Sequence, residues 1–501
     1  MSKRIIVNGF YNERGYMLDY LRQKHGWDPV FFMGRKQERQ WVEANYSNTI
    51  FVDAMELRLS HFDYSPLGPV VPIDRAIIRT LSRYEHSCFG LMEDATGWDF
   101  SEAERRRFYY DMLRYWNTVI HRLKPDIFVS WALPHNTPDY TLYLLCKHVY
   151  HIPTVFTDSI PYMENYSACH DEVEDLSSAF KDVYHSTQKL ELSPETKEYL
   201  NNIRTQNLND PKFITIDNIN KKYSYGRAIA QLIKRIPFMF KKQQVAVKHN
   251  RHPFGSPKTE MSVFQYDLWQ FLIMLKNKAI YKLYASYAKE PDLNKKYVLF
   301  AANYQPEGTT CPLAETYDDL LLILDLLSAS VPKDWVIYYK EYPQRLMQTY
   351  YKFCLARNKS YYERIASLKN VQMIPSEMNT TELIKNSQAV ATATSTVGWE
   401  AAVKGKPVLI FGSVWYGGCK SIFRIETYQD CLAAMDKIKN GYKPDQADVD
   451  RYAAAIEKSS HPLFVHRDFD QRIKDCPDQK HEMERIAKAF YEAYERYYIS
   501  K

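Results

Sequence analysis

The chain has 501 residues, which is too long for one hydrophobic core and predicts two domains. Its apolar share of 45% and charged share of 25% are those of a globular protein rather than a disordered or fibrous one. The net charge of +6 is mild, so it is compatible with an anionic substrate or a membrane surface and demands neither.

Cysteine spacing and the first residues bear on the compartment. The eight cysteines have no CxxC spacing, which argues against a zinc site or a redox motif; they stand at positions 88, 146, 169, 311, 354, 419, 431 and 476. Residues 1–7 run directly into a strand pattern without an apolar signal core, and no run of about 18 uncharged apolar residues exists. We therefore expect a reduced, cytoplasmic protein without a membrane span.

The first part of the chain alternates apolar strands with helices. Strands are expected over 4–10, 29–33, 127–131 and 154–157, and helices over 15–24, 101–122 and 140–150, with residues 54–124 mostly helical. The long helix starts at the capping-box sequence Ser101-Glu-Ala-Glu. Only Gly9 lies in the first turn, so the dinucleotide fingerprint GxGxxG is absent.

The segment Pro134–Tyr143 follows the strand over 127–131 at once. It places His135 and Asp139 at the carboxyl end of a strand, where α/β enzymes keep their working groups. We predict Asp139 as the main catalytic carboxylate, with His135 close enough to orient it. The alternatives are that Asp139 only caps the helix from Tyr140 and that His135 is a turn residue beside proline.

Residues 165–290 are the least readable part. Between breakers at Asp210-Pro and 251–257 runs a basic amphipathic stretch, Lys221–Lys242. Such a stretch can lie on anionic lipid, or it can be a solvated helix that covers the junction between the domains. Both interpretations stay open.

The second part again alternates strands and helices, which predicts a doubly wound parallel sheet. Strands are expected over 296–301, 335–339, 371–374, 390–393 and 408–411, helices over 318–329, 348–368 and 381–388, and a last helix over 481–500. The turn Thr394-Ser395-Thr396 ends one of these strands and opens a helix. Its hydroxyls and backbone N–H groups suit a phosphate, and the alternative is an ordinary Ser/Thr N-cap.

Five motifs in order carry a family resemblance: Asn303-Tyr-Gln-Pro-Glu, Lys340-Glu-Tyr-Pro, Thr394-Ser-Thr-Val-Gly-Trp-Glu-Ala, Gly405-Lys-Pro-Val and Phe411-Gly-Ser-Val-Trp-Tyr. Together they resemble the bacterial capsule polysaccharide biosynthesis family, which includes Kdo-transferase-like glycosyltransferases. Residues 134–143 resemble a stretch of the same family's first domain, so the likeness runs over roughly 125–160 and 295–420.

The resemblance implies an α/β fold of the GT-B type, with two Rossmann-like domains that face a cleft. The implied division is an acceptor-side domain over 1–205, a helical, basic insertion or linker over 206–290, a nucleotide-sugar domain over 291–475 and a helix over 476–501 that crosses back to the first domain. The donors known for the family are CMP-linked ulosonic acids such as CMP-Kdo.

The chemistry of the residues themselves suggests the donor-side groups, in agreement with the resemblance. Ser395 and Thr396 would hold the departing phosphate, with Lys340 and Tyr342 nearby, and Glu400 or Glu307 would hold ribose hydroxyls. Thr394, Gly398 and Gln305 complete the expected nucleotide site, and Glu307 is a second candidate for catalysis. The chain departs from the family at Tyr342, where His is usual, and at Asn303, where His is frequent.

We therefore expect a metal-independent glycosyltransferase without a cofactor, which takes a nucleotide sugar and a glycan or glycolipid acceptor and does not bind nucleic acid. A peripheral contact with the inner membrane or with other capsule enzymes fits the same interpretation. Two alternatives remain: a transferase that uses a UDP- or GDP-sugar, which Tyr342 in place of His favours, and a non-catalytic capsule assembly protein.

Overall fold

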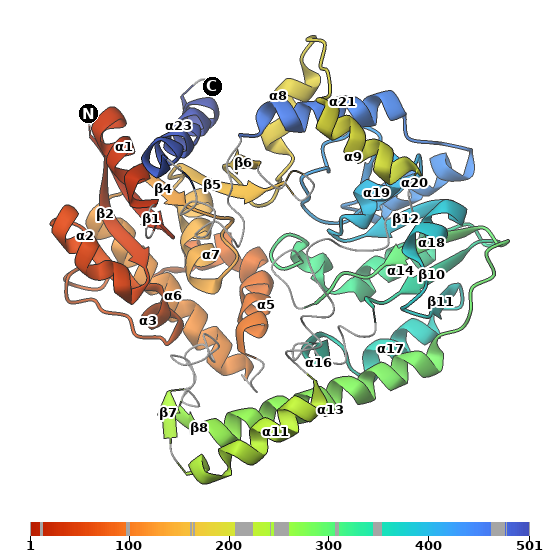
Figure 1. Cartoon of the computed structure of the whole chain (residues 1–501), viewed down its shortest axis with the longest axis horizontal. Coiled ribbons are helices and arrows are strands. Elements are labelled where there is room, and N and C mark those ends of the chain that lie inside the picture. Colours follow the sequence, from red (N-terminus) through yellow and green to blue (C-terminus); the bar gives the residue numbers. More distant parts are fainter. Residues whose placement is uncertain are drawn as a thin grey trace.

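The computed structural model describes residues 2–10, 14–96, 101–160, 163, 166–205, 224–240, 242–244, 260–305, 310–343, 353–461, 476 and 478–499. Two six-stranded sheets dominate it, and helices cover both faces of each sheet (Figure 1). Among the described helices, none has an apolar stretch long enough to cross a bilayer.

The first sheet has the strand order β3-β2-β1-β4-β5-β6. Its strands are β1 (Lys3–Asn8), β2 (Trp27–Gly34), β3 (Ile50–Asp53), β4 (Ile127–Ser130), β5 (Thr154–Ser159) and β6 (Ser167–His170). All neighbours are parallel except β5 and β6. The order reverses between β1 and β4, as in the doubly wound dinucleotide-binding folds, so this gap is the topological switch point of the sheet.

Side chains of the first sheet alternate between two hydrophobic clusters, because successive strand residues point to opposite faces. On β1, Ile6 belongs to the cluster under the helices of 75–145, and Ile5 and Val7 belong to the opposite one. The covering elements are α1 (Gly15–His25), η2 (Lys36–Glu38), α2 (Arg39–Asn45), α3 (Ala54–Arg58), α4 (Arg75–Leu81), η3 (Ser82–Tyr84), α5 (Glu85–Thr96), α6 (Glu102–Leu123), α7 (Thr137–Leu144) and the π-helical turn η4 (Leu145–Val149).

The second sheet repeats the same order, β11-β10-β9-β12-β13-β14, with every pair parallel. Its strands are β9 (Tyr297–Ala301), β10 (Val336–Lys340), β11 (Val371–Ile374), β12 (Ala389–Thr392), β13 (Val408–Ile410) and β14 (Phe423–Arg424). The covering elements are η7 (Glu315–Asp318), α14 (Leu320–Ser330), α16 (Phe353–Ala356), α17 (Lys359–Ser367), α18 (Thr380–Asn386), α19 (Val397–Val403), α20 (Tyr428–Lys439) and α21 (Gln446–Ser459). Its switch point lies between β9 and β12.

Two Rossmann-like sheets of equal strand order confirm the predicted α/β architecture of the GT-B type. The predicted return of the final helix is also confirmed. Helix α23 (Gln479–Tyr498) packs on α1, β5 and β6 of the first domain. Its residues Met483, Ile486 and Phe490 share a buried cluster with Ile5 and Leu18.

The packing divides the chain differently from the boundaries predicted at 205 and 290. Helices α8 (Ser178–His185) and α9 (Pro194–Thr205) precede the first boundary, yet they pack on α21 and α19 of the second domain. Helix α13 (Val263–Tyr287) falls in the predicted linker, yet Tyr284 lies in the core of the second domain. An amphipathic pattern shows that a helix has a buried face, but not which sheet covers that face.

Several predicted helix limits are wrong for local reasons. The helix expected from Tyr140 begins at Thr137, because Asn136 serves as N-cap and Pro138 is compatible with the first turn. The helix expected over 348–368 is interrupted, since Asn358 caps a new helix, α17. Asp318 and Asp319, expected inside a helix, instead end η7 and cap α14.

A helical hairpin extends from the second domain and runs below both domains in the view of Figure 1. It consists of α11 (Tyr225–Arg235), η5 (Ile236–Phe238) and α13, with the short strands β7 (Lys242–Gln244) and β8 (Glu260–Ser262) at its end.

Candidate active site between the two switch points

Polar side chains meet at the switch point of the first sheet. Asn8 ends β1, and Ser130 ends β4. The Asn8 amide donates hydrogen bonds to Ser130 Oγ at 3.0 Å and to Asp139 Oδ2 at 3.4 Å. Gly9 follows with φ of +79°, and a Cβ there would meet Cβ of Trp131 at 3.1 Å, so the turn after β1 requires glycine.

Asp139 lies in this cluster as the third residue of α7. Its Oδ1 accepts a hydrogen bond from the Asn136 backbone N–H at 2.7 Å, which completes a capping box. Asp139 therefore does help to cap a helix, as the alternative interpretation expected. It does so from within the first turn of α7, and not as the N-cap of a helix that begins at Tyr140. Burial raises the pKa of Asp139, and the charges of His135 and Arg58 and the Asn136 hydrogen bond oppose that rise.

His135 is exposed, and its Nδ1 lies 2.5 Å from the Leu133 carbonyl. It is close enough to two carboxyl groups to lower their pKa, and the second of them is Asp158 at the end of β5. Burial raises the pKa of Asp158 to about 6. The structure thus brings together the predicted pair, His135 and Asp139, and adds a second carboxylate.

At the switch point of the second sheet, Asn303 braces the turn after β12. Its amide donates to Thr394 Oγ1 at 2.9 Å, and its oxygen accepts from Thr392 Oγ1 at 3.2 Å and from Thr394 N at 3.4 Å. Asn303 is buried, and both the nitrogen and the oxygen of its side-chain amide are hydrogen-bonded within the turn. This residue therefore holds the shape of the turn.

The predicted phosphate-binding turn presents its hydroxyls unequally. Thr394 is buried against Asn303, whereas Ser395 Oγ accepts from Val397 N at 3.3 Å. Thr396 is exposed and makes no side-chain cap on α19. Gly398 keeps room for Tyr416, whose hydroxyl donates to the Ser395 carbonyl; a Cβ at Gly398 would lie 2.4 Å from that hydroxyl.

Lys340 ends β10 and is almost completely buried, with 6% of its surface exposed. Because side chains alternate along a strand, Lys340 lies on the same face of β10 as Tyr338. Tyr338 packs in the cluster under α18 and α19, and the Thr394–Thr396 turn opens α19. Lys340 and this turn therefore lie on the same side of the sheet. Burial lowers the pKa of Lys340 to about 8, against the opposing charges of Glu377 and Glu341. In the described part of the chain, no hydrogen bond joins it to the turn.

A buried ion pair fixes the segment after β10. Arg357 Nε donates to Glu341 Oε2 at 2.8 Å, and the two side chains are 2% and 1% exposed. Tyr339 and Tyr362 donate to the same carboxylate at 2.8 and 3.0 Å, and Arg357 Nη1 donates to Gln305 Oε1 at 2.8 Å. The predicted donor residue Gln305 is therefore held by Arg357.

Of the remaining predicted residues, two pack against other elements and one lies outside the described structure. Tyr342 is half-buried beside Tyr304, with ring centroids 5.4 Å apart. Glu400 lies on the side of α19 that faces α9, where burial raises its pKa to about 7 against the charge of Lys404. Glu307 lies outside the described residues, so its role in catalysis or ribose binding stays a prediction.

The loop after β9 joins the two halves of the site. Cys311 and Leu313 of the second domain pack in the same hydrophobic cluster as Tyr140, the neighbour of Asp139. Cys311 Sγ lies 3.1 Å from the Ser87 carbonyl of α5. At its other end the loop lies beside the Thr394–Thr396 turn. Gly412 is in close contact with both, because a Cβ at Gly412 would lie 2.6 Å from Thr394 Cγ2 and 2.8 Å from the Leu313 carbonyl oxygen.

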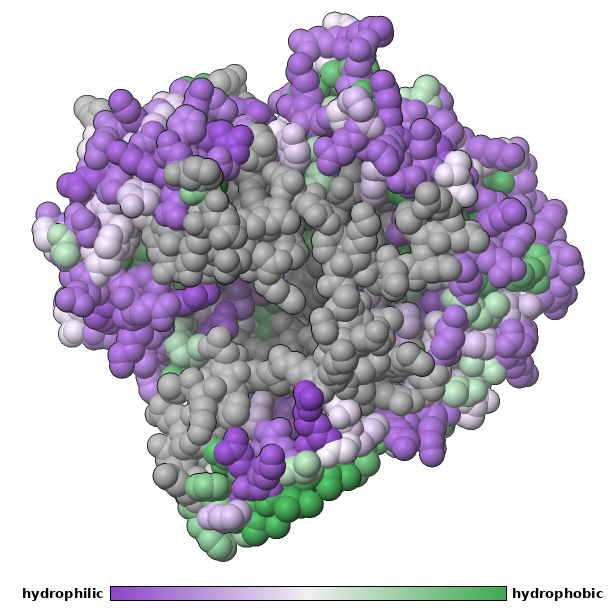
Figure 2. All heavy atoms as spheres, viewed as in Figure 1, coloured by the Kyte–Doolittle hydropathy of each residue, from purple (hydrophilic) through white to green (hydrophobic). Residues whose placement is uncertain are grey.

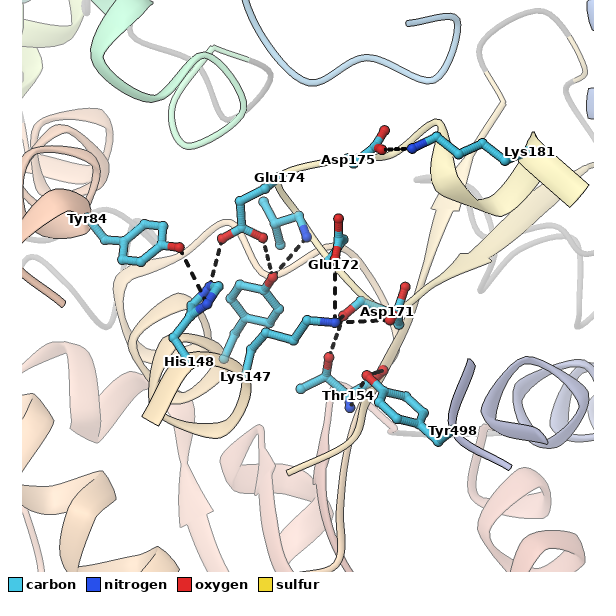
Figure 3. Close-up of polar contacts among 12 residues, drawn as sticks. Tyr84, Lys147, His148, Thr154, Asp171, Glu172, Glu174, Asp175, Lys181 and Tyr498 are labelled. Atoms are coloured by element: carbon cyan, nitrogen blue, oxygen red, sulfur yellow. Dashed lines mark hydrogen bonds and ion pairs between the residues drawn. The ribbon is translucent and has the colours of Figure 1, made fainter. Parts of the chain in front are cut away.

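An acidic segment, Asp171–Asp175, connects β6 to α8 and so connects the domains (Figure 3). The π-helical turn η4 holds it, since Lys147 Nζ lies 3.0 Å from Asp171 Oδ2 and His148 Nε2 lies 2.9 Å from Glu174 Oε1. Burial raises the pKa of Glu174, but hydrogen bonds from His148 and Tyr143 outweigh it, so the pKa is lowered.

Sequence reasoning missed four groups at the strand ends: Asn8, Ser130, Asp158 and the Glu341–Arg357 pair. Asn8 and Asp158 each end a recognisable apolar strand, and that position was the available signal. Ser130 lies at the end of the strand predicted over 127–131 and carried the same signal, whereas Arg357 carried none. Among the described residues, no cluster of three or more His, Cys, Asp or Glu side chains could hold a metal ion.

Solved structures and curated proteins were compared with the chain. A β-Kdo 2,4 transferase, KpsC of Thermosulfurimonas dismutans, is 13% identical with a TM-score of 0.27, over 66% of this chain and 87% of that one. A trehalose-phosphate synthase of Burkholderia vietnamiensis is 11% identical with a TM-score of 0.28, over 95% and 98%. A UDP-GlcNAc 2-epimerase of Methanocaldococcus jannaschii is 10% identical with a TM-score of 0.24, over 91% and 100%. No curated protein matches the chain.

A family model does match. Residues 281–422 fit the model described as capsule polysaccharide biosynthesis protein. The match runs from the last part of α13 to the loop before β14, and it includes all five motifs quoted for the resemblance; residues 125–160 lie outside it. The second domain of the chain is therefore similar to the capsule polysaccharide biosynthesis family over residues 281–422.

Proposed function

We propose that the protein is a glycosyltransferase of capsule or surface polysaccharide biosynthesis, which transfers a sugar from a nucleotide donor on the second domain to a glycan or glycolipid acceptor on the first. The match of residues 281–422 to the capsule polysaccharide biosynthesis model supports the pathway. One observation supports the activity: the loop of Cys311 and Leu313 contacts the hydroxyl-bearing turn at one switch point and packs beside Tyr140, the neighbour of the buried carboxylate at the other. Switch points are where α/β sheets bind ligands.

The donor half suits a departing phosphate. Transfer from a nucleotide sugar builds negative charge on the phosphate, and preorganised donors lower the barrier by stabilising that charge. Ser395 and Thr396 offer hydroxyls, and Lys340 offers a positive charge on the same side of the sheet. These groups can act without a metal ion, and a metal-independent reaction is part of the proposal.

The acceptor half suits proton removal. Asp139 is buried with a raised pKa, which makes its carboxylate more basic than an exposed one. In an inverting reaction it would take the proton of the acceptor hydroxyl, and in a retaining reaction it could attack the sugar instead. Asp158, whose pKa is about 6, is the alternative base near the same imidazole, His135.

For the donor, we favour a CMP-linked ulosonic or nonulosonic acid such as CMP-Kdo, in line with the family resemblance. A specific observation favours the second candidate, a UDP- or GDP-sugar. Asn303 and Tyr342 replace the family's histidines, Asn303 is committed to the turn, and Tyr342 pairs with Tyr304 as an aromatic surface on which a base could stack.

The test is a product assay with the full chain, a panel of CMP-, UDP- and GDP-sugars and a tagged acceptor glycan, preceded by nucleotide thermal-shift screening. Stabilisation by CMP with transfer from a CMP-sugar supports the first donor, and the same response to UDP or GDP supports the second. A folded protein that responds to no nucleotide and forms no product would contradict the proposal and leave a non-catalytic assembly role.

A further inference from the structure

Among the described elements, α13 is the helix that packs the hairpin of α11, η5 and α13 against the second domain. Helix α13 packs on α16, α17 and β11, whereas α11 packs on α13 and has no buried residue. Gln231 Nε2 donates to Asp267 Oδ1 at 2.9 Å, and the Tyr225 hydroxyl donates to the Met274 carbonyl at 3.2 Å. Residue numbers rise along one helix as they fall along the other, so the helices are antiparallel.

Each helix carries an exposed apolar stripe with the spacing of a single helix face. Ile229, Ile233 and Ile236 are 46%, 62% and 53% exposed. Leu268, Leu272 and Leu275 on α13 are 37%, 54% and 43% exposed. Steps of four and three residues keep side chains on one side of a helix, so each set forms a continuous stripe.

The two stripes face the same way. Arg235 and Asp267 face each other across the pair at 3.4 Å, and the residue after each of them belongs to a stripe: Ile236, the first residue of η5, and Leu268 of α13. The next residue lies about 100° further round the helix. Because the helices are antiparallel, equal rotations turn both stripes to one side. Figure 2 shows the result, with apolar side chains gathered along the free edge of the hairpin.

The hairpin holds most of the large apolar side chains that the described residues expose. Of thirteen such side chains, eight lie on the hairpin: the two stripes and Phe238 and Phe240, which are 44% and 92% exposed. Such a concentration of exposed apolar surface marks an interaction site rather than ordinary scatter.

The charge of the hairpin identifies what would cover the face. The described residues 224–240 and 262–287 contain six Lys and Arg side chains and one acidic side chain, Asp267. That is a net charge of +5 in the hairpin, against +6 for the whole chain. A second copy of this face would bring positively charged side chains against each other. A neutral protein surface would offer these lysine and arginine side chains no negative partner. Basic residues around an apolar face are the combination that binds at the interface of an anionic bilayer.

We propose that the hairpin α11/α13 seats the protein on an anionic lipid bilayer, with the isoleucine and leucine stripes and Phe240 inserted among the headgroups. The lysine and arginine side chains contact the lipid phosphates, and the cleft between the domains is held near the membrane surface. This inference does not depend on the sugar-transfer activity.

The test is flotation of the full chain with phosphatidylcholine vesicles that contain or lack phosphatidylglycerol. The protein should bind only the anionic vesicles, and raised salt should release it, because salt screens the lysine and arginine charges. The variant Ile233→Ser/Phe240→Ser should lose at least about tenfold in affinity, since two exposed apolar side chains no longer insert. The matched control is Leu322→Ser, which removes an exposed apolar side chain of α14 and should bind like the wild type.

Circular dichroism and the melting temperature should be unchanged in both variants, because the replaced side chains are exposed. Equal vesicle binding by Ile233→Ser/Phe240→Ser and the wild type would overturn the proposal, as would a folded wild type that binds no anionic vesicle. Sedimentation without lipid tests whether a second copy of the chain covers the face. If the wild type is a dimer and the variant Ile233→Ser/Phe240→Ser is a monomer, the face is a dimer interface and the membrane proposal is overturned.

Discussion

Asp139 combines a capping role with the proposed catalytic role, and Asp139→Asn separates them. Asparagine can still accept the Asn136 N–H bond, so unfolding stability should change by no more than about 1 kcal/mol. Loss of the base or nucleophile should lower turnover by about 100-fold or more. Turnover with saturating donor and a urea unfolding curve check the two expectations.

Asp158→Asn is the matched control for that experiment, because Asp158 lies near the same His135. If Asp158→Asn abolishes turnover and Asp139→Asn keeps it near normal, Asp158 is the base and Asp139 is a capping residue only.

We predict that nucleotide binding depends on pH through the charge of Lys340. Burial lowers its pKa to about 8, so its positive charge is present below that pH and lost above it. If Lys340 binds the donor phosphate, affinity should be highest below pH 8 and should fall by up to about tenfold per pH unit above it. Calorimetric titration of the nucleotide between neutral and alkaline pH measures this.

The variant Lys340→Arg tests the assignment, since arginine keeps its charge over the same range. Its binding should be independent of pH there. An unchanged alkaline decline in Lys340→Arg would show that another group titrates.

The hydroxyls of the donor turn make a separate prediction. The double variant Ser395→Ala/Thr396→Ala should weaken nucleotide binding by roughly 1–3 kcal/mol, as expected for lost hydrogen bonds to a charged group. Ser367→Ala, which removes an exposed hydroxyl of α17 in the same domain, is the control. Unchanged affinity in the folded double variant would move the phosphate site elsewhere.

At the scale of elements, the Glu341–Arg357 pair joins β10 to the helices beyond it. Arg357→Met leaves Glu341 as a buried carboxylate without its cation, which should cost roughly 3–5 kcal/mol of unfolding free energy. The double variant Arg357→Met/Glu341→Gln should recover part of that loss, because no charge is left buried. Denaturant unfolding gives both values, and a double variant no more stable than the single one would contradict the explanation.

The elements that the sequence predicted best are the central strands. β1, β4, β9 and β12 are covered on both faces, so they appear as short apolar runs with sharp ends. The strands at the sheet edges, β3, β6 and β14, are short and carry polar residues, and no pattern marked them.

The candidate site was predictable to the same extent. Residues that follow a central strand, such as Asp139, Lys340 and Thr394, could be found because strand ends are visible in the sequence. Their partners could not, because contacts such as Cys311 with Ser87 join residues 224 positions apart. Burial, which shifts the pKa of Lys340 and Asp158, is a property of the folded molecule and leaves no local pattern.

At the scale of the whole molecule, we predict that nucleotide binding closes the cleft. The segment Asp171–Asp175 connects the domains, and they also contact each other through Cys311 and Leu313 and through His86 Nε2 with Asp318 Oδ1 at 2.5 Å. Closure would exclude water from the donor phosphate. The radius of gyration from small-angle scattering should decrease when nucleotide is added to the wild type and not when it is added to Ser395→Ala/Thr396→Ala. An unchanged radius with saturating, calorimetrically verified nucleotide would contradict closure.

The return of α23 to the first domain has a consequence for the order of synthesis. A ribosome releases β1 to β6 first, then the second domain, and α23 after it. Until then Ile5, Leu18 and their neighbours lack the apolar cover that Met483, Ile486 and Phe490 supply. The domain that begins the chain is therefore finished after the domain inserted into it, and during translation its open face is the surface that chaperones would have to shield.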